Sequence, residues 1–356
     1  MPAFTIFLPY YNDEDFLEQS IKSILSNEFQ DYELILLNHN STDRSRSIAH
    51  SFNDDRIIHI DIDINYLAGG GVLFKKALSI AKGKYFKPFC ADDIMTPDCL
   101  REIFKFMESH KNIDFAFTGV QHINLHGKII HTPKIKKISS KETFFELLNE
   151  RNFLCYPASV VKTDALRNIS IDNSYILLFD LSLWVSLLVN NYKIGFLEGR
   201  HILYRIHDKQ VSKNSAQVSR LYNMEIKSFW RLFTKINDVD VVKSFWPNSE
   251  LVRKLNYPKD IPFVVSREML VSKLYDGNSF VFLHDIMMNE REAISIEERF
   301  NYDLKSFRKD MLSFTTYDQK NNFKELTYNT SPKFLSLKSL AFLFLRKIFN
   351  NAKKLS

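Results

Sequence analysis

The sequence has few of the residues that support disulfide-bonded or zinc-binding folds. Its 3 cysteines, Cys90, Cys99 and Cys155, show no regular spacing in 356 residues, which argues against a disulfide framework and against a zinc site. Glycine is also scarce, at 9 residues. The segment after the first apolar run, LPYYNDED, lacks the glycines and arginines that nucleotidyltransferases usually carry there, so that class is not favoured.

Long apolar segments are absent as well. No run reaches the roughly 20 residues of a transmembrane helix, and the start, MPAFTIFLPYYNDED, lacks the basic region of a signal peptide. We therefore expect a protein of the reducing cytoplasm. The net charge of +6 suits an anionic ligand or a membrane surface. We expect no nucleic-acid partner, because no basic stripe with interleaved aromatic residues is present.

The first hundred residues alternate between short apolar runs and amphipathic segments. Strands are expected at residues 4–8, 32–37, 56–60 and 84–89, and helices within residues 12–27, 41–52 and 71–83. Repetition of strand and helix predicts parallel pairing with right-handed crossovers. Ligands of such sheets bind beyond the carboxyl ends of the strands.

The remaining sequence is mixed and then helical. A hairpin is expected around NLHG, an apolar helix in FDLSLWVSLLVNN, and two short strands in KIGFLEGRHILYRIHD. From about Val211 onward the pattern is helical and charged. We predict an α/β domain in residues 1–212, with an open, mixed and mainly parallel sheet flanked by helices, and a mainly helical region in residues 213–356.

Two adjacent aspartates follow the fourth expected strand, in YFKPFCADDIMTPD. Asp92 and Asp93 lie at the ligand edge of the sheet, and two neighbouring carboxylates repel each other unless a cation neutralises them. Mg²⁺ and Mn²⁺ prefer such oxygen ligands. The alternative is a solvated turn that uses aspartate as a loop residue and helix cap. The pair alone leaves both interpretations open.

Three segments in order resemble the family 2 glycosyltransferases of the GT-A (Rossmann-like) fold. They are FTIFLPYYNDEDFLEQSIKSILSNEFQDYELILLNHNSTDRS, ALSIAKGKYFKPFCADDIMTPDCL and FDLSLWVSLLVNNYKIGFLEGRHILYRIHDKQVS. The resemblance covers residues 4–212. It implies a nucleotide-binding half at residues 1–105 and an acceptor half at residues 106–212.

The resemblance implies a role for each matching residue. Asp93 matches the ligand of Mn²⁺ or Mg²⁺, and Asp92 matches its neighbour, which contacts the donor ribose or sugar. Asp180 matches the catalytic base, with Phe179 in place of the first acid of a Glu-Asp pair. His207 matches a histidine near the diphosphate or the metal. The remaining matches are cofactor-binding residues: Arg205 beside His207, and the nucleotide loop of Pro9, Tyr10 and Asn12.

Several positions depart from the family pattern. Asn38 and His39 stand where an acidic pair helps to recognise the nucleotide base, which weakens the expectation of uridine. Phe74 and Lys75 stand where the family has Arg-Asn, and Lys75 or Lys76 can substitute as a point charge. Cys90 replaces the first acid of the Asp-x-Asp motif.

The implied function is inverting transfer of a hexose or N-acetylhexosamine from a nucleotide-diphosphate sugar, with UDP as the first expectation. The acceptor would be a glycan or lipid-linked glycan in bacterial surface polysaccharide or lipooligosaccharide synthesis. The alternative is a non-catalytic GT-A-like scaffold in a polysaccharide assembly complex, suggested by Asn38 and His39. The sequence leaves homo-oligomer formation open.

Simpler interpretations exist for single residues. Asp180 could cap a helix, His207 could be a surface histidine, and Cys90 a small packed side chain. Trp184 is expected in the core because its neighbours are apolar. The three histidines of the expected hairpin lack acidic company, so a metal site there is not favoured (His122, His126, His131).

The last segment, residues 331–356, has six Lys or Arg, no acid, and apolar residues at helical spacing. A basic amphipathic helix of this kind can bind an anionic membrane surface or dock on protein, and the sequence leaves both open. The membrane alternative would place the enzyme at the inner face of the cell membrane.

Overall fold

The computed structural model describes residues 1–64, 70–148, 152–208, 210, 220–222, 224–225, 230–271 and 276–312. Residues 1–304 form one compact unit, and residues 305–356 are assigned to a second. The basic amphipathic segment at 331–356 lies outside the described residues, so membrane binding and docking on protein both stay open. Residues 211–219 also lie outside them, so the domain boundary expected at 212 stays a prediction. No helix among the described residues is both long and apolar enough to cross a membrane.

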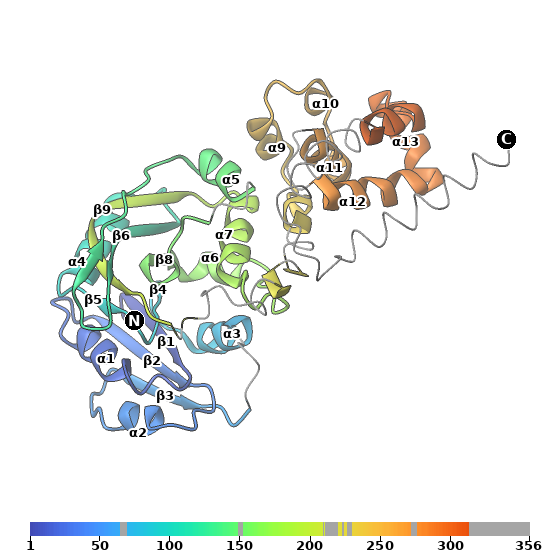
Figure 1. Cartoon of the computed structure of the whole chain (residues 1–356). Coiled ribbons are helices and arrows are strands. Elements are labelled where there is room, and N and C mark those ends of the chain that lie inside the picture. Colours follow the sequence, from blue (N-terminus) through green and yellow to red (C-terminus); the bar gives the residue numbers. More distant parts are fainter. Residues whose placement is uncertain are drawn as a thin grey trace. The chain divides into compact units, whose positions relative to one another are not determined.

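A mixed sheet forms the centre of the first unit (Figure 1). Its strands follow the order β3-β2-β1-β4-β8-β6-β9-β5, with β7 paired to β6. The parallel half consists of β1 (Phe4–Tyr10), β2 (Tyr32–Asn38), β3 (Ile57–Asp61) and β4 (Tyr85–Pro88). The other half contains β5 (Ile94–Met95), β6 (Phe115–Ile123), β7 (Ile129–His131), β8 (Ser159–Lys162) and β9 (Ile194–Arg205).

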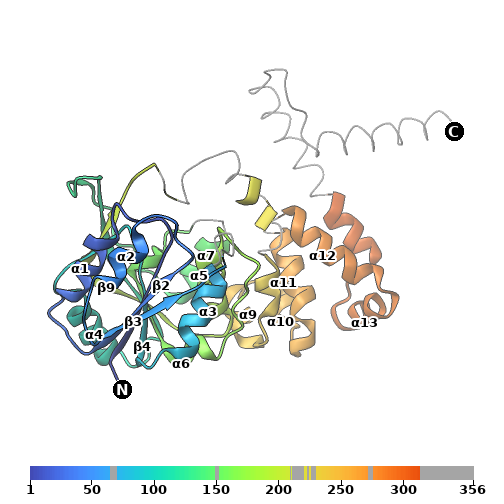
Figure 2. The ribbon, with the colours of Figure 1, turned by 90° about the horizontal axis from the view of Figure 1, so that it is seen from below.

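Helices cover both faces of this sheet. Figures 1 and 2 show α1 (Leu17–Leu25), α2 (Ser45–His50) and α4 (Cys99–Ser109) on one face. The opposite face carries α3 (Gly70–Ile80), α6 (Thr163–Arg167) and α7 (Phe179–Val189). Two further elements lie between β7 and β8 in the sequence. They are α5 (Ser140–Leu148), which contacts α7, and the short 3₁₀ helix η1 (Tyr156–Ala158). The four expected strands and the three helices between them are thus confirmed.

The helical prediction after Val211 also holds in the described residues. These are η2 (Trp230–Lys235), α9 (Val239–Phe245), α10 (Glu250–Arg253), η3 (Pro258–Asp260), α11 (Ile261–Val271), α12 (Asp276–Met288) and α13 (Glu290–Phe300). One expectation was wrong. The segment predicted to contain two short strands forms the single 12-residue strand β9. It pairs in parallel with β6 through register shifts around Gly119, and Gly199 has φ +92°.

The core explains why these segments fold as they do. Every residue of β2 is buried, as expected for a strand covered by helices on both faces. Helix α1 buries Leu17, Ile21 and Ile24 on one side. Every residue of helix α7 except Asp180 is buried, and Trp184 stacks on Phe115 with ring centroids 6.2 Å apart. Its predicted place in the core is confirmed.

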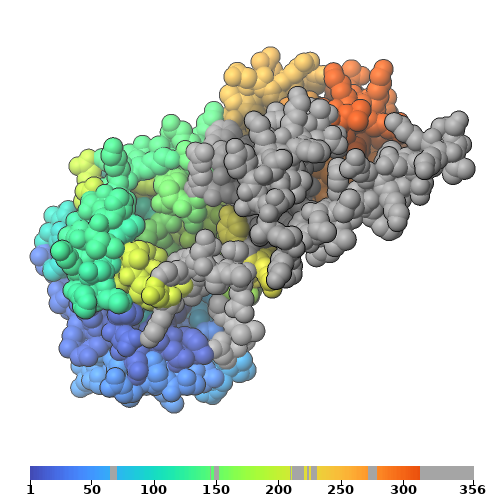
Figure 3. Space-filling view, viewed as in Figure 1, coloured from blue at the N-terminus to red at the C-terminus, as the bar shows by residue number. Residues whose placement is uncertain are grey.

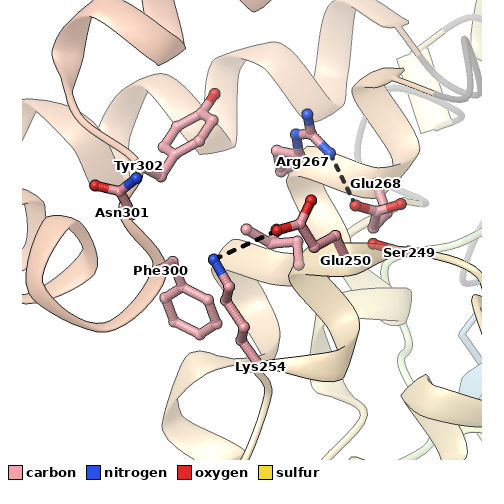
Figure 4. Close-up of a pocket in the computed structure, with 9 residues that line it drawn as sticks. Ser249, Glu250, Lys254, Arg267, Glu268, Phe300, Asn301 and Tyr302 are labelled. Carbon is pink, nitrogen blue, oxygen red and sulfur yellow. Dashed lines mark hydrogen bonds and ion pairs between the residues drawn. The ribbon is translucent and has the colours of Figure 1, made fainter.

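A cavity of about 320 Å³ lies in the helical region and contains none of the predicted site residues (Figure 4). Its charged side chains pair with one another. Arg267 lies 3.1 Å from Glu268, and Lys254 lies 3.9 Å from Glu250. The lining is therefore close to charge balance without a bound ion.

Candidate active site

The acidic loop begins where β4 ends. Backbone N–H of Asp93 donates to the carbonyl of Cys90 at 3.3 Å, and the Ser20 hydroxyl donates to the same carbonyl at 3.2 Å. This tight turn gathers one ligand atom each of Cys90, Asp92 and Asp93 within 4.8 Å of one another. No other group of at least three potential metal ligands occurs in the described part of the chain, the histidine-bearing hairpin included.

Asp93 is the buried member of this group, with 1% of its surface exposed. Its Oδ1 accepts the backbone N–H of Arg205 at 2.9 Å, whereas its Oδ2 is buried and has no hydrogen-bond partner among the described residues. Burial, and then the charge of Asp92, raise the pKa of Asp93 well above its usual range. A buried carboxylate oxygen without a partner is costly. A divalent cation would satisfy it, so this donor set fits Mg²⁺ or Mn²⁺.

Asp92 contacts the predicted histidine. His207 Nε2 lies 2.9 Å from Asp92 Oδ2, and the His207 ring packs on Phe16 with centroids 4.9 Å apart. The side chain of His207 is buried, which does not fit an ordinary surface histidine. Its Nδ1 has no hydrogen-bond partner in the described residues. His207 thus orients Asp92, and its role as a metal ligand stays a prediction.

Arg205 fastens the acidic loop to two other parts of the fold. Its Nε donates to the Asp92 carbonyl at 2.8 Å, and its Nη2 donates to Gln19 Oε1 at 2.7 Å. Its Nη1 donates to the carbonyls of Asn124 at 3.2 Å and Leu125 at 3.1 Å. In Figure 3 the yellow atoms around the end of β9 lie beside green atoms of the hairpin region and above the blue N-terminal residues. With most of its N–H donors, Arg205 therefore holds the acidic loop, the hairpin and α1 together.

Asp13 was not among the predicted site residues, because it falls within the helix expected in residues 12–27. Its Oδ2 accepts the backbone N–H of Tyr11 at 2.9 Å. Burial raises the pKa of Asp13 to about 6, and the charge of Asp92 contributes to the rise, while that of His207 opposes it. The electrostatic influence of these two residues places Asp13 near the acidic loop. Helix α1 begins only at Leu17, so Asp13 lies in the loop after β1.

The predicted nucleotide loop lies at the carboxyl ends of β1, β2 and β3. Tyr10 is paired in register with Asn38, and Asn38 with Asp61. Asn12 has φ 55°, and its Oδ1 accepts the backbone N–H of Thr42 at 2.8 Å. This bond ties the loop after β1 to the loop after β2. Pro9 is the penultimate residue of β1.

Asp61 supplies a carboxylate that was not predicted from the sequence. Its Oδ1 accepts from Asn38 Nδ2 at 2.9 Å, and its Oδ2 accepts from Arg46 Nη2 at 3.1 Å and contacts His50 Nε2 at 3.0 Å. The acid at this edge is thus on β3 instead of β2. The buried His39 has its pKa lowered by burial, and its ring lies 5.9 Å from that of Tyr11. In the sequence, the only signal for Asp61 was its position directly after RIIHI.

Lys75 and Lys76 are exposed on α3. The charge of Lys75 acts on Asp172, outside the acidic loop, so donor contacts by these lysines stay a prediction. A different lysine lies behind the loop. Lys87 on β4 is fully buried, and its ammonium donates to the carbonyls of Pro88, at 3.2 Å, and Pro157. Burial lowers its pKa to about 8. It links the end of β4 to η1.

Asp180 lies in the first turn of α7. Its Oδ1 accepts the N–H of Leu181 at 2.7 Å, and its Oδ2 accepts from Asn152 Nδ2 at 3.0 Å. The N-cap residue is Leu178, so Asp180 is not the cap of this helix. Burial raises the pKa of Asp180 from 3.8 to about 6. A carboxylate with such a pKa is suited to accept a proton near neutral pH.

Cys155 connects the two acidic positions. Burial raises the pKa of its thiol, and the charges of Asp93 and Asp180 add to that rise. Both carboxylates therefore act electrostatically on the same half-buried thiol. Burial also raises the pKa of the Cys90 thiol well above its usual range, which agrees with the expectation that Cys90 is not a nucleophile.

The fold is an α/β sheet with acidic side chains gathered at its carboxyl edge, and comparison with known proteins identifies its class. Residues 5–170 match the family model described as Glycosyl transferase family 2. The chain carries a family 2 glycosyltransferase domain, and it is a glycosyltransferase. The predicted family is thus confirmed.

Similar proteins include an uncharacterized glycosyltransferase of Methanocaldococcus jannaschii, 29% identical over 235 residues, which cover 65% of this chain and 80% of the relative. A UDP-Glc:alpha-D-GlcNAc-diphosphoundecaprenol beta-1,3-glucosyltransferase of Escherichia coli, WfaP, is 28% identical over 224 residues, 60% of this chain and 81% of the relative. The crystal structure of S. aureus TarS 1–349 with UDP-GlcNAc matches with a TM-score of 0.57 and 14% identity, covering 88% of this chain and 92% of that one. This likeness confirms the predicted GT-A fold.

Proposed function

We propose that the protein is a metal-dependent inverting glycosyltransferase that moves a sugar from a nucleotide-diphosphate sugar to a hydroxyl group of a glycan. Two carboxylates carry this proposal. The buried Asp93 Oδ2 has no hydrogen-bond partner among the described residues, while the elevated pKa of Asp180 prepares a second carboxylate for proton transfer. One carboxylate suits a cation and the other suits a general base.

Asp93 and Asp92 would hold Mn²⁺ or Mg²⁺. When bound, the ion would stabilise the negative charge that develops on the leaving nucleoside diphosphate. His207 keeps Asp92 in place through its Nε2, and Arg205 fixes the loop backbone through the Asp92 carbonyl. The chain therefore prepares the site before the donor binds, which is how positioned charges contribute most to catalysis.

Asp180 would remove the proton from the attacking hydroxyl of the acceptor. With a pKa of about 6 it is mostly ionised at pH 7.5, yet basic enough to take a proton in the transition state. The hydroxyl attacks the anomeric carbon on the side opposite to the diphosphate. A single displacement inverts that carbon and requires no covalent bond between sugar and enzyme.

The donor nucleotide is the less constrained part of the proposal. UDP is our first choice, supported by WfaP, whose name states a UDP-Glc donor, and by TarS, whose crystal structure contains UDP-GlcNAc. Asn38 and His39 differ from the usual acidic pair, and Asp61 on the neighbouring strand supplies a carboxylate at the same edge. A lipid-linked glycan acceptor in surface polysaccharide synthesis is supported by the names of WfaP and of a second Escherichia coli relative, WfgD.

The test is a panel of UDP, GDP, dTDP and CDP sugars with Mn²⁺, with release of the nucleoside diphosphate as the measured rate. We expect one UDP-sugar to be turned over, and Asp180→Asn to lower that rate about 10²- to 10⁴-fold with unchanged donor affinity. Exclusive turnover of a non-uridine sugar would overturn the donor assignment. Full activity of Asp180→Asn would show that another group acts as the base.

A further inference from the structure

Glu225 contacts the segment that leads into α7, although it lies outside the residues matched to the family and outside the predicted catalytic domain at 1–212. Its Oε1 accepts the backbone N–H of Ile176 at 2.7 Å. Its Oε2 accepts the backbone N–H groups of Leu177 at 3.0 Å and Leu178 at 2.9 Å. The side chain is 7% exposed. Three consecutive amides of residues 176–178 thus bind one buried carboxylate.

Glu225 fixes the segment that leads into α7. The first amides of a helix have no partner within it, and they are usually satisfied by a Ser, Thr, Asp or Asn side chain at the N-cap. The N-cap of α7 is Leu178, whose apolar side chain cannot accept a hydrogen bond. A carboxylate at the amino end of a helix also interacts favourably with the helix dipole. Glu225 brings this charge from 47 residues farther along the chain, and it accepts the amides of the N-cap residue and of the two residues before it.

Asp180 lies just after the segment that Glu225 binds. Asp180 follows Leu178 by two residues, so the path of residues 176–178 determines where α7 starts and where the Asp180 carboxylate points. Among the described residues, its side-chain hydrogen-bond partners are Leu181 and Asn152. A displacement of about 1 Å at a reacting group can cost a factor of about 10² in rate.

We propose that Glu225 is a positioning residue for transfer, which orients Asp180 by binding the amides of residues 176–178. The helical region beyond residue 212 thereby completes the catalytic site. This inference rests on the proposed function, because it takes Asp180 as the base. It adds that the predicted catalytic domain at 1–212 lacks a group that its own base requires.

The informative variant is Glu225→Gln. Its carboxamide keeps one acceptor oxygen but turns an NH₂ group toward backbone amides, so at least one of the three N–H groups loses its acceptor. We expect kcat to fall about 10- to 100-fold. The KM for the nucleotide sugar should stay within about twofold, because the acidic loop is untouched. Glu225→Asp keeps the charge but is one methylene shorter, and we expect an intermediate kcat.

A double variant separates positioning from general destabilisation. If Glu225 acts through Asp180, then Asp180→Asn combined with Glu225→Gln should be no slower than Asp180→Asn alone. Amide hydrogen exchange of residues 176–181 should become faster in Glu225→Gln and remain slow in Asp180→Asn. A matched control is Asp260→Asn. Asp260 is 3% exposed and pairs with Arg299 at 2.8 Å, so this change also removes a buried charge from the helical region. It should leave kcat unchanged.

The measurements use the full chain, Mn²⁺ and the sugar nucleotide that the donor panel selects. Wild-type kcat in folded Glu225→Gln would overturn the inference. So would a fall in kcat equal to that of Asp260→Asn, or effects of Glu225→Gln and Asp180→Asn that multiply. If Glu225→Gln is recovered only unfolded, Glu225→Asp is judged by the same criteria. Normal turnover of Asp180→Asn alone would instead refute the base assignment.

Discussion

Replacing Asp180 by asparagine should make the protein more stable at pH 8 while it slows turnover. The folded-state pKa of Asp180 is about 6, against an ordinary value of 3.8. Folding therefore favours the protonated carboxyl. Its favourable contribution is complete below pH 4, and it is lost as the pH rises through 6. At pH 8 the wild-type fold holds an ionised, desolvated carboxylate, whereas the asparagine variant does not.

The shift in the pKa of Asp180 sets the size of the expected change in stability. About 2 pKa units at 1.36 kcal/mol each give roughly 3 kcal/mol as an upper limit at pH 8. Asp180 is only partly buried, and the new amide would face the NH₂ of Asn152, which donates to Asp180 in the wild type. That mismatch costs about 1 kcal/mol. We expect Asp180→Asn to raise the free energy of unfolding by about 1–2 kcal/mol at pH 8. Most of this gain should vanish at pH 4.5.

Urea unfolding at 25 °C and at both pH values measures these differences. Asp54→Asn is the matched control with the opposite sign. A hydrogen bond from Arg56 lowers the pKa of Asp54 to about 2, so its ionised form stabilises the fold above the ordinary pKa. That variant should lose stability at pH 8, and its deficit should shrink as the pH falls. If Asp180→Asn is no more stable than wild type at pH 8, or if its gain is independent of pH, Asp180 is not desolvated and the argument for its basicity fails.

Three further predictions concern the sheet edge. Asp93→Asn should abolish the Mn²⁺ dependence of nucleotide binding without loss of the fold, and calorimetry with an unchanged affinity would contradict the metal assignment. In Arg205→Lys, a single ammonium cannot reach the four acceptors that Arg205 binds. We therefore expect a lower melting temperature and about tenfold weaker Mn²⁺-dependent nucleotide binding. Wild-type values for both would show that Arg205 has no role in the loop. Asn38→Asp should destabilise the fold by about 1–3 kcal/mol in urea unfolding at pH 8, because it replaces the amide donor to Asp61 with a second carboxylate. Unchanged stability would show that Asn38 is not required by Asp61.

Sequence patterns could predict the parallel half of the sheet because its strands are short, largely apolar runs, and β2 and β4 are buried throughout. They could not predict β9. Its sequence, IGFLEGRHILYR, is interrupted by Gly199, by charged residues and by mixed burial, and its pairing with β6 shifts register around Gly119. A strand that bends in this way loses the regular alternation that marks a strand, and only its pairing with β6 keeps it continuous.

The candidate site shows the same limit. Asp92 and Asp93 could be found because a buried strand leads directly to them, so a local pattern fixes their place at the ligand edge. The contacts of Arg205 with Asp92 join residues 113 positions apart, and those of Glu225 with Leu178 join residues 47 apart. No local pattern reports such pairs. Glu225 lies in a segment that reads only as charged helix, and its importance follows from the three amides that the fold places around it.

The same reasoning explains how the departures at Asn38 and His39 are compatible with a working site. An acid at position 38 would lie in register with Asp61, and two carboxylates there would repel each other. Asparagine instead donates to Asp61, whose other oxygen accepts from Arg46 and contacts His50. The carboxylate at this edge has therefore moved to the neighbouring strand, with its charge balanced by Arg46. Loss of the acidic pair from β2 is then a rearrangement of charge, which weakens the main reason to regard the chain as a non-catalytic scaffold.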